Sequence, residues 1–404
     1  MRILLLNQTF YPDVASTAQH LTDLALDLVK AGCKVTVLTD SRAYNSRRHI
    51  YPSYENYCGI KIRRIKSTWF GKRSVFSRAA DFGSFNLNLA LRFLFYPKFD
   101  VVVGLTSPPL IAFFGVLFCL IKGGKFIYWT MDLNPDEGVA LGWLKKGSFL
   151  ERLLDWISKF SFYKSSYIIA LDRFMKERIE KKGIISKKII TLPPWSHDDL
   201  EFVPHDRNPF RRHYNLMDKF VVMYSGNHSV CHPLDTLLEA ALLLKENKKI
   251  MFLFIGGGSR VRDVLEFKEK HSLPNVMYLP YQDRSKLKYS LSAADLHVIT
   301  VGKDFVGIVH PCKVYNILRI GSPFVLIGPK ESNVGDIISQ EGVGYQVEHG
   351  DAKGLLEVIS EVSKLSDRDK EYIRKKSQRL AQERYSRKVL STKLVNLICG
   401  KLEG

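Results

Sequence analysis

Short apolar runs alternate with helix-like segments from the first residues onward, and this alternation restricts the fold more than any other feature. Residues 3–6 are wholly apolar and of strand length. Residues 17–31 then place apolar side chains at helical spacing, and Gly32 follows as a helix stop signal. A second apolar run covers 35–38. Strand, helix and strand within forty residues predict a βαβ unit, and continuous apolar strands predict a parallel sheet covered on both faces.

The alternation runs through the chain in two series, which predicts two domains. A length of 404 residues suits two domains of about 200 residues each. The expected strands of the first series are 3–6, 35–38, 60–65, 101–105, 126–130, 167–170 and 189–192, and those of the second are 220–224, 251–255, 276–279, 296–299, 324–327 and 345–347.

A proline pair and a polar stretch separate the two series. Pro193 and Pro194 are followed by polar residues up to 212, so we expect domains at 1–195 and 213–380. After residue 364 no strand is evident, and residues 381–404 are expected to form a helix that returns to the first domain. The predicted fold is α/β: two doubly wound, Rossmann-like domains facing each other across a cleft. Ligands of such sheets bind at the carboxyl ends of the strands.

Two loops of the second domain have features of a phosphate site. Residues 225–232 join a strand to a helix that starts near Pro233, where free backbone N–H groups and the helix end favour an anion. His228 and His232 can add donors, although a plain strand–helix turn also explains this loop. Lys313 falls in the first turn of another helix, where a cation opposes the helix dipole. This indicates a nearby anion, with a solvated lysine as the alternative.

Five segments in order along nearly the whole chain resemble family 4 retaining glycosyltransferases, which have the two-domain GT-B fold. The segments are 1–40, the acceptor-facing Tyr-Trp-Thr-Met-Asp-Leu-Asn-Pro-Asp at 128–136, the donor-phosphate loop at 225–239, the glycine turn at 255–260 and Ser-Ala-Ala-Asp-Leu at 292–296.

The resemblance implies site residues and a reaction. We expect a hexosyltransferase that takes sugar from a nucleotide-sugar donor with retention at the anomeric carbon. Asp132 is the candidate catalytic residue beside the acceptor, and a carboxylate that caps the turn before Pro135 is the alternative. The remaining implied residues are Ser225, Gly226, Asn227, His232 and Lys313 for the donor phosphates; Asp304, Gly307 and Ile308 for the sugar; Gly256, Gly257, Tyr281 and Asn316 for the nucleotide; and Ser16 and Thr17 on the acceptor side.

The sequence departs from the family pattern at several of these positions. Many members carry two glutamates eight residues apart, where this chain has Ile308 (or nearby Asp304) and Asn316. The usual Arg and Lys of the phosphate loop correspond to Asn227 and His232. Two alternatives therefore stay open: a nucleotide-sugar epimerase on the same fold, and a non-catalytic partner subunit.

No metal or other cofactor is expected. The developing charge on a leaving diphosphate can be stabilised by backbone amides, a helix end and basic side chains. The one Asp-x-Asp sequence, 367–369, lies in the charged tail. The six cysteines are scattered without a CxxC pair, which argues against a zinc site and for a reducing compartment.

The positive charge gathers in the first half of the chain. The net charge is +19, and residues 1–190 hold 29 basic and 15 acidic residues. Residues 61–78 interleave seven cations with Trp69, Phe70 and Phe76. This pattern favours an anionic membrane surface and a lipid-linked or polysaccharide acceptor. A plain solvated loop is the alternative, and nucleic acid is not expected as a partner.

The same residues predict where the protein works. The longest uncharged apolar run, 110–121, is shorter than the roughly 18 residues of a membrane span, and the N-terminus is typical of a buried strand rather than of a secretion signal. We therefore expect a cytoplasmic enzyme, peripheral at the inner face of the cell membrane and active in cell-envelope glycan synthesis.

Overall fold

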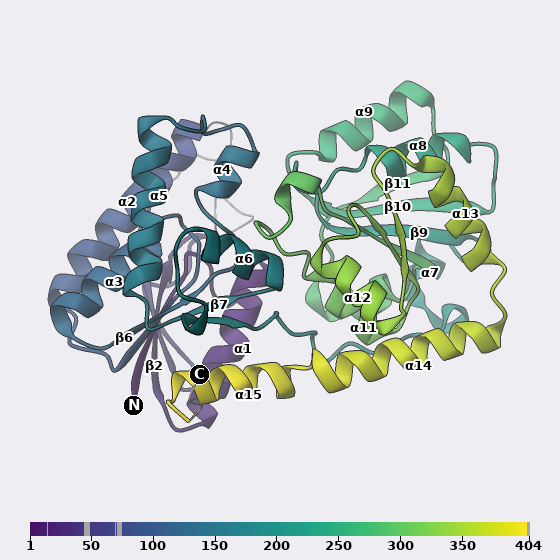
Figure 1. Ribbon diagram of the computed structural model, residues 1–404. Coiled ribbons are helices and arrows are strands. Elements are labelled where there is room, and N and C mark those ends of the chain that lie inside the picture. Colours follow the sequence, from purple (N-terminus) through teal and green to yellow (C-terminus); the bar gives the residue numbers. More distant parts are fainter. Residues whose placement is uncertain (14, 44–48, 69, 71–74, 402–404) are drawn as a thin grey trace. The chain divides into compact units, whose positions relative to one another are not determined.

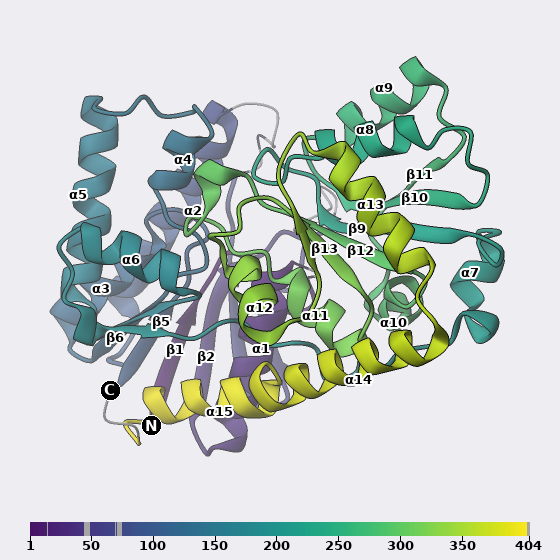
Figure 2. The same ribbon diagram turned by 45° about the vertical axis from the view of Figure 1, so that its right-hand side comes forward.

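The computed structural model describes residues 1–13, 15–43, 49–68, 70 and 75–401. The chain divides into two compact units, shown as ribbons in Figures 1 and 2. Unit 1 consists of Met1–Pro194, Gly307–His310 and Lys388–Gly404. Unit 2 consists of Trp195–Val306 and Pro311–Arg387.

Unit 1 contains an eight-stranded sheet with the order β3-β4-β2-β1-β5-β6-β7-β8. All neighbours are parallel except β3 and β4. The chain therefore changes direction across the sheet between β1 and β5. The elements are β1 (Arg2–Leu6), α1 (Ser16–Lys30), β2 (Lys34–Asp40), β3 (Tyr54–Tyr57), β4 (Ile60–Ile65), α2 (Val75–Phe95), β5 (Val101–Gly104), α3 (Ile111–Lys122), β6 (Lys125–Trp129), α4 (Asp136–Ala140), α5 (Phe149–Lys164), β7 (Tyr167–Ala170), α6 (Arg173–Lys181) and β8 (Ile189–Thr191), with α15 (Arg387–Ile398) from the C-terminal part of the chain.

Helices cover the sheet of unit 1 on both faces. Helices α2, α3 and α5 pack side by side on one face, and α1 lies on the other (Figures 1 and 2). The central strands between these layers are apolar, and residues 3–6 of β1 are fully buried. Helix α15 packs near α1, where the Ser391 hydroxyl donates to Oδ2 of Asp27 at 2.6 Å.

Unit 2 contains a six-stranded parallel sheet with the order β11-β10-β9-β12-β13-β14. Counted along the chain this is 3-2-1-4-5-6, the order of the dinucleotide-binding fold, with its switch point between β9 and β12. The elements are α7 (Pro209–His213), β9 (Phe220–Asn227), α8 (Asp235–Leu243), β10 (Ile250–Gly257), α9 (Val261–His271), β11 (Val276–Leu279), α10 (Leu287–Leu291), β12 (Leu296–Thr300), α11 (Lys313–Ile320), β13 (Phe324–Ile327), α12 (Asn333–Glu341), β14 (Tyr345–Val347), α13 (Ala352–Ser363) and α14 (Asp367–Arg384).

The predicted fold class of two doubly wound α/β domains is confirmed, and two details differ. The short strand β3 was not expected, because Tyr-Glu-Asn-Tyr is polar; it pairs antiparallel with β4 through a two-residue hairpin turn at Cys58 and Gly59, both with positive φ. The sequence placed the start of the returning segment at 381, whereas α14 continues to Arg384 in unit 2 and the C-terminal part of unit 1 begins at Lys388. Among the described residues, no helix is both long enough and apolar enough to cross a membrane.

Candidate functional site

The expected phosphate loop lies at the switch point of the sheet in unit 2. The pairing of β9 with β10 continues to their ends, where Gly226 faces Gly256 and Asn227 faces Gly257. Strand β12 pairs with β9 on the other side. The loops after β9, β10 and β12, which carry most of the predicted donor residues, therefore emerge at one edge of the sheet, where such sheets bind ligands.

Close backbone contact explains the glycines at this edge. Gly256 has φ of +137°, and a Cβ atom there would collide with the carbonyl oxygen of Gly226. Gly258 has φ of +139°, and a Cβ atom there would collide with the carbonyl oxygen of His228. Glycine is the residue that adopts such φ values and lets two backbones approach. The two loops are thus held together without intervening side chains.

Lys313 places an ammonium group against this loop. It is the first residue of α11, and its Nζ atom is buried, with no hydrogen-bond partner among the described residues. Nζ lies 3.7 Å from the centre of the Tyr224 ring, and it would lie 3.0 Å from a Cβ atom built on Gly226. Burial lowers the pKa of Lys313 to about 7. A buried cation that lies against an aromatic face and has no hydrogen-bond partner among the described residues is suited to an incoming anion.

Two histidines next to Lys313 are held in their neutral form. Burial, helped by the positive charge of Lys313, lowers the pKa of His228 to about 4 and that of His232 to about 3. Nδ1 of His228 lies 3.1 Å from the carbonyl oxygen of Gly226, and Nδ1 of His232 lies 2.7 Å from that of Thr300. Because a carbonyl only accepts, each Nδ1 carries the proton. These rings fix the loop rather than adding positive charge, so Lys313 supplies the cation.

The other predicted donor residues differ in their exposure and in their contacts. Ser225 is half-buried and Asn227 is exposed at the end of β9. The half-exposed ring of Tyr281 packs against Gly257. The side-chain oxygen of Asn316 accepts a hydrogen bond from the backbone N–H of His197 at 3.0 Å, which engages it within unit 2.

The predicted sugar residues do not fall in one unit. Asp304 is exposed in a short 3-10 helix, Lys303–Phe305, of unit 2. Gly307 and Ile308 belong to unit 1. The carbonyl of Ile308 accepts from the backbone N–H of Leu133 at 3.0 Å, and Gly307, with φ of +71°, packs against the backbone of Phe174. Glycine at 307 is thus explained by packing within unit 1.

A histidine–aspartate pair in the same segment was missed by sequence reasoning. Nδ1 of His310 lies 2.7 Å from Oδ2 of Asp172, and both side chains are buried. Asp172 also caps α6, accepting from the backbone N–H of Met175 at 2.8 Å. An Asp directly after a strand and before a helix is a recognisable cap in the sequence. Nothing near it in the sequence indicates a partner 138 residues away.

Asp132 follows β6 at the carboxyl edge of the sheet in unit 1. Burial raises the pKa of Asp132 to about 8, and the negative charge of Glu137 contributes to the shift. Helix α4 begins after Pro135 without a side-chain cap. Asp132 therefore does not cap α4. A carboxyl that keeps its proton near neutral pH can donate or accept a hydrogen bond.

Ser16 and Thr17 lie at the beginning of α1, beside the switch point of the sheet in unit 1. Ser16 is the exposed first residue of the helix, and Oγ1 of Thr17 lies 3.3 Å from Oγ1 of Thr9. The adjoining loops after β1 and β5 are joined by a 2.7 Å hydrogen bond from the backbone N–H of Gln8 to the carbonyl of Ser107. The predicted acceptor residues thus lie at the edge where ligands of such a sheet bind.

One cation of the basic stretch 61–78 does not face solvent. Arg64 is buried: its guanidinium donates to the carbonyls of Tyr11 and Pro52 and pairs with Glu55 at 2.8 Å. The expectation that Arg64 faces a membrane is therefore wrong, because the side chain is used to hold loops of unit 1 together. Arg63 is exposed on β4. Trp69, Lys72 and Arg73, as well as the side chains of Phe76 and Arg78, lie outside the described residues.

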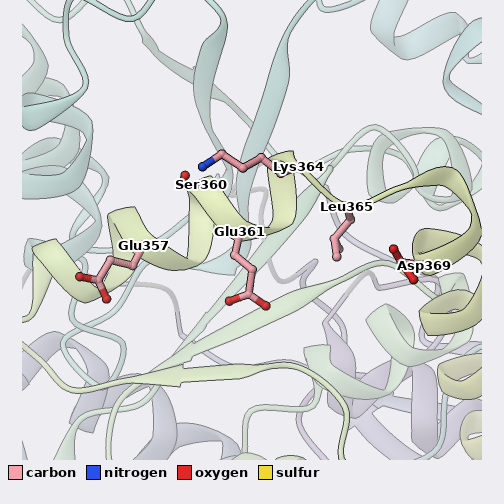
Figure 3. A pocket seen from close by; sticks show the side chains of 6 residues that line it. All are labelled: Glu357, Ser360, Glu361, Lys364, Leu365 and Asp369. Atoms are coloured by element: carbon pink, nitrogen blue, oxygen red, sulfur yellow. The ribbon is translucent and has the colours of Figure 1, made fainter.

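An open hollow lies elsewhere in unit 2, on α13 and at the start of α14. Figure 3 shows its lining: Glu357, Ser360, Glu361, Lys364, Leu365 and Asp369. Three carboxylates against one ammonium group make it unsuited to a diphosphate, and it does not lie at a strand end. Among the described residues, no group of three or more His, Cys, Asp or Glu side chains is arranged to hold a metal ion.

Comparisons with known proteins match both halves of the chain. The model of Glycosyltransferase Family 4 matches residues 17–198, and that of Glycosyl transferases group 1 matches residues 206–379. Among curated proteins, the probable glycosyltransferase WbjE of Pseudomonas aeruginosa is 25% identical over 267 residues, which span 66% of each chain. The putative colanic acid biosynthesis glycosyl transferase WcaI of Escherichia coli is 22% identical over 381 residues, covering 88% of this chain and 90% of that protein.

A solved structure shares the fold along the whole chain. The structure of HepE from Anabaena, solved in complex with UDP and also with UDP-glucose, matches with a TM-score of 0.73 and 14% identity over 99% of this chain and 100% of HepE. At this identity the likeness concerns the fold alone. Together with the two family models, which cover most of both sheets, it leads to one conclusion: the chain belongs to the group 1 glycosyltransferases with the GT-B fold.

Proposed function

We propose that this protein is a retaining hexosyltransferase that moves a sugar from a nucleoside diphosphate sugar to a lipid-linked or polysaccharide acceptor in cell-envelope glycan synthesis. The observation that carries the donor assignment is the buried Nζ of Lys313, which lies beside Gly226 and has no hydrogen-bond partner in the described part of the chain. A diphosphate at this loop would restore the full charge of Lys313 and receive hydrogen bonds from it. The same contact would strengthen as charge develops on the leaving group, which lowers the barrier to transfer.

The residues of unit 1 support an acceptor at its strand ends. Asp132, with its raised pKa, holds a proton near neutral pH and can hydrogen-bond an acceptor hydroxyl. The resemblance to family 4 glycosyltransferases supports the proposal of retention, in which the departing phosphate oxygen would help to deprotonate the acceptor hydroxyl. No divalent metal is invoked, since the buried ammonium group takes its role at the diphosphate.

The relatives suggest the biological setting. WcaI is named for colanic acid biosynthesis, and HepE was solved with UDP-glucose. We therefore propose a uridine diphosphate sugar as the donor. The acceptor would be a glycan or lipid-linked glycan reached at the inner face of the cell membrane, with the protein attached there peripherally.

The test begins with binding and ends with chemistry. The purified chain is titrated calorimetrically with UDP, ADP and GDP, and then incubated with the matching nucleotide sugars and a lipid-linked acceptor extract. We expect binding of one diphosphate, release of that diphosphate with turnover, and NMR of the product showing the anomeric configuration of the donor. Interconversion of the donor sugars without transfer would identify the epimerase alternative. Absence of binding by any nucleotide would identify the non-catalytic subunit.

A further inference from the structure

Helix α5 carries large apolar side chains on the face that it turns to solvent. Its inner face packs on the rest of unit 1. Phe162 is buried and stacks on Tyr128 at 5.1 Å between ring centres, and Phe160 packs on Phe113 of α3 at 5.8 Å between ring centres. The outer face is nevertheless apolar. Phe149 is 82% exposed and Trp156 is 59% exposed. We call this the α5 surface; it consists of Trp143, Phe149, Leu150, Leu153, Trp156 and Tyr163, all exposed.

The apolar character continues over the neighbouring helices. Helices α2, α3 and α5 pack side by side on the same face of the sheet (Figures 1 and 2). Leu94 and Phe95 at the end of α2, and Leu120 and Ile121 at the end of α3, are also exposed. The ends of α2 and α3 are joined by Lys122, whose Nζ donates to the carbonyl of Leu94 at 3.1 Å. Exposed apolar side chains on three neighbouring helices are typical of an interaction surface.

The charges around the α5 surface indicate what it binds. Residues 143–164 contain five basic and two acidic residues. Both acidic side chains are engaged locally: Glu151 accepts from the backbone N–H of Gly147 at 3.1 Å, and Asp155 pairs with Lys159 and Lys182 at 2.8 Å. The basic side chains exposed beside the aromatic residues are Lys145, Lys146, Arg152 and Lys164.

From this arrangement we infer that the α5 surface docks unit 1 on an anionic phospholipid bilayer. Tryptophan, phenylalanine and leucine insert at the level of the headgroups, while the flanking lysines and arginine bind the lipid phosphates. The same charges oppose a second copy of this chain as the occupant, because self-association through this face would bring two sets of cations together. The inferred docking surface is therefore α5 and the loop before it.

The position of the α5 surface links docking to the proposed reaction. Asp132 and the α5 surface lie on the same connection, between β6 and β7, and Phe149 begins the helix at the strand-end edge of the sheet. A lipid-linked acceptor in the bilayer would present its headgroup on this side of unit 1. This inference rests on the proposed transfer of sugar to a lipid-linked acceptor. Its test measures lipid binding alone, so it can fail or succeed separately from sugar transfer.

The experiment is vesicle sedimentation of the full chain. Vesicles of phosphatidylcholine alone are compared with vesicles containing phosphatidylglycerol, at low and high salt. Two double variants probe the surface: Phe149→Ser with Leu150→Ser, and Lys145→Glu with Lys146→Glu. Matched controls in unit 2 replace exposed residues of similar character, Leu243→Ser with Tyr372→Ser and Lys270→Glu with Lys375→Glu.

We expect the wild-type chain to bind only anionic vesicles, with affinity that falls as salt rises. Each surface variant should bind at least ten-fold more weakly, and both controls should bind as wild type does. Tryptophan fluorescence should shift to the blue on binding and be quenched by brominated lipid, since Trp143 and Trp156 are exposed whereas Trp129 and Trp195 are buried. Circular dichroism and melting temperature establish that each variant is folded.

Three results would overturn the inference. The first is a wild-type chain that stays in the supernatant with anionic vesicles at low salt. The second is unchanged binding by both surface variants, with loss of binding instead on replacing Lys72 and Arg73, which would assign docking to the stretch 61–78. The third is a concentration-dependent dimer in lipid-free solution that the Phe149 and Leu150 substitutions dissociate.

Discussion

The ammonium group of Lys313 lies 3.7 Å from the centre of the Tyr224 ring, and no described residue offers it a hydrogen bond. Lys313 is the first residue of α11, where the positive end of the helix dipole disfavours a cation. Such a position costs stability in the free protein and becomes favourable when an anion arrives. Donor affinity and folding stability should therefore respond in opposite directions when this residue is changed.

Replacing Lys313 with Met should weaken binding of the nucleoside diphosphate by about 1.5–3 kcal/mol, the range for a hydrogen bond to a charged group. The same substitution should raise the melting temperature of the free chain, because it removes a buried cation that has no described hydrogen-bond partner. Calorimetric titration with UDP and thermal unfolding give the two readings. Weaker binding with a lower melting temperature would mean that the lysine supports the fold instead.

Donor binding should depend on pH through Lys313. With a pKa of about 7 in the free protein, the side chain is mostly neutral at pH 8.5 and must take up a proton when a diphosphate binds. Affinity should be constant below pH 7 and fall as pH rises above it, up to the higher pKa of the bound state. Calorimetry in two buffers of different ionisation enthalpy measures the proton uptake. The Lys313→Arg variant, which does not titrate in this range, should lose most of this pH dependence.

Gly256→Ala should disrupt the donor loop. A Cβ atom there would collide with the backbone of Gly226, which lies on the neighbouring strand and has no flexible side chain to move aside. We expect a loss of about 2 kcal/mol or more in unfolding free energy, together with weaker UDP binding. The control is Gly350→Ala, which has a positive φ of +85° but open space around the added atom. Equal losses in both variants would mean that φ strain, and not the contact between strands, is responsible.

The sequence predicted the sheets well because their signal is local. Strands such as β7 and β13 are continuous apolar runs whose boundaries the sequence pattern located correctly. Strand β3 was missed because its four residues are polar and it is stabilised by pairing with β4 and by the Arg64–Glu55 ion pair. The pattern Lys-Ile-Arg-Arg-Ile does not distinguish buried Arg64 from exposed Arg63, because the sequence alone does not say what packs against each face of the strand.

The same local signal decided which site residues the sequence could single out. Lys313 could be found because a lysine in a first helical turn is unfavourable by itself. The pair of His310 and Asp172 could not be found from the sequence. It depends on a short segment, 307–310, that belongs to unit 1 although the segments on either side of it belong to unit 2. The α5 surface was overlooked for another reason: an apolar helix predicts burial, and only the packing of α5 on α3 shows that one apolar face is left over.

Turnover should not require a divalent metal ion. The proposal assigns neutralisation of the departing diphosphate to Lys313 and the loop N–H groups, so excess chelator should leave activity unchanged. The assay is release of nucleoside diphosphate with and without EDTA, followed by addition of Mg²⁺ or Mn²⁺. Loss of activity that either ion restores would show that a metal supplies part of the charge.

The last prediction concerns Asp132. Its pKa is raised above the ordinary value, so the folded state holds a proton that the unfolded state has already lost at neutral pH. The stability associated with this proton is fully present below about pH 4 and is lost as pH rises towards about 8. Asp132→Asn, which cannot ionise, should therefore unfold at a higher temperature than wild type at pH 8–9 and show a flatter dependence on pH. Glu137→Gln removes the neighbouring negative charge and should move the wild-type transition to lower pH.

In sugar transfer, Asp132→Ala should lose more activity than Asp132→Asn, because the amide can still hydrogen-bond an acceptor hydroxyl. Identical pH profiles of stability for wild type and Asp132→Asn would mean that this carboxyl is solvated and ordinary, and the acceptor contact would have to be sought at another strand end of unit 1.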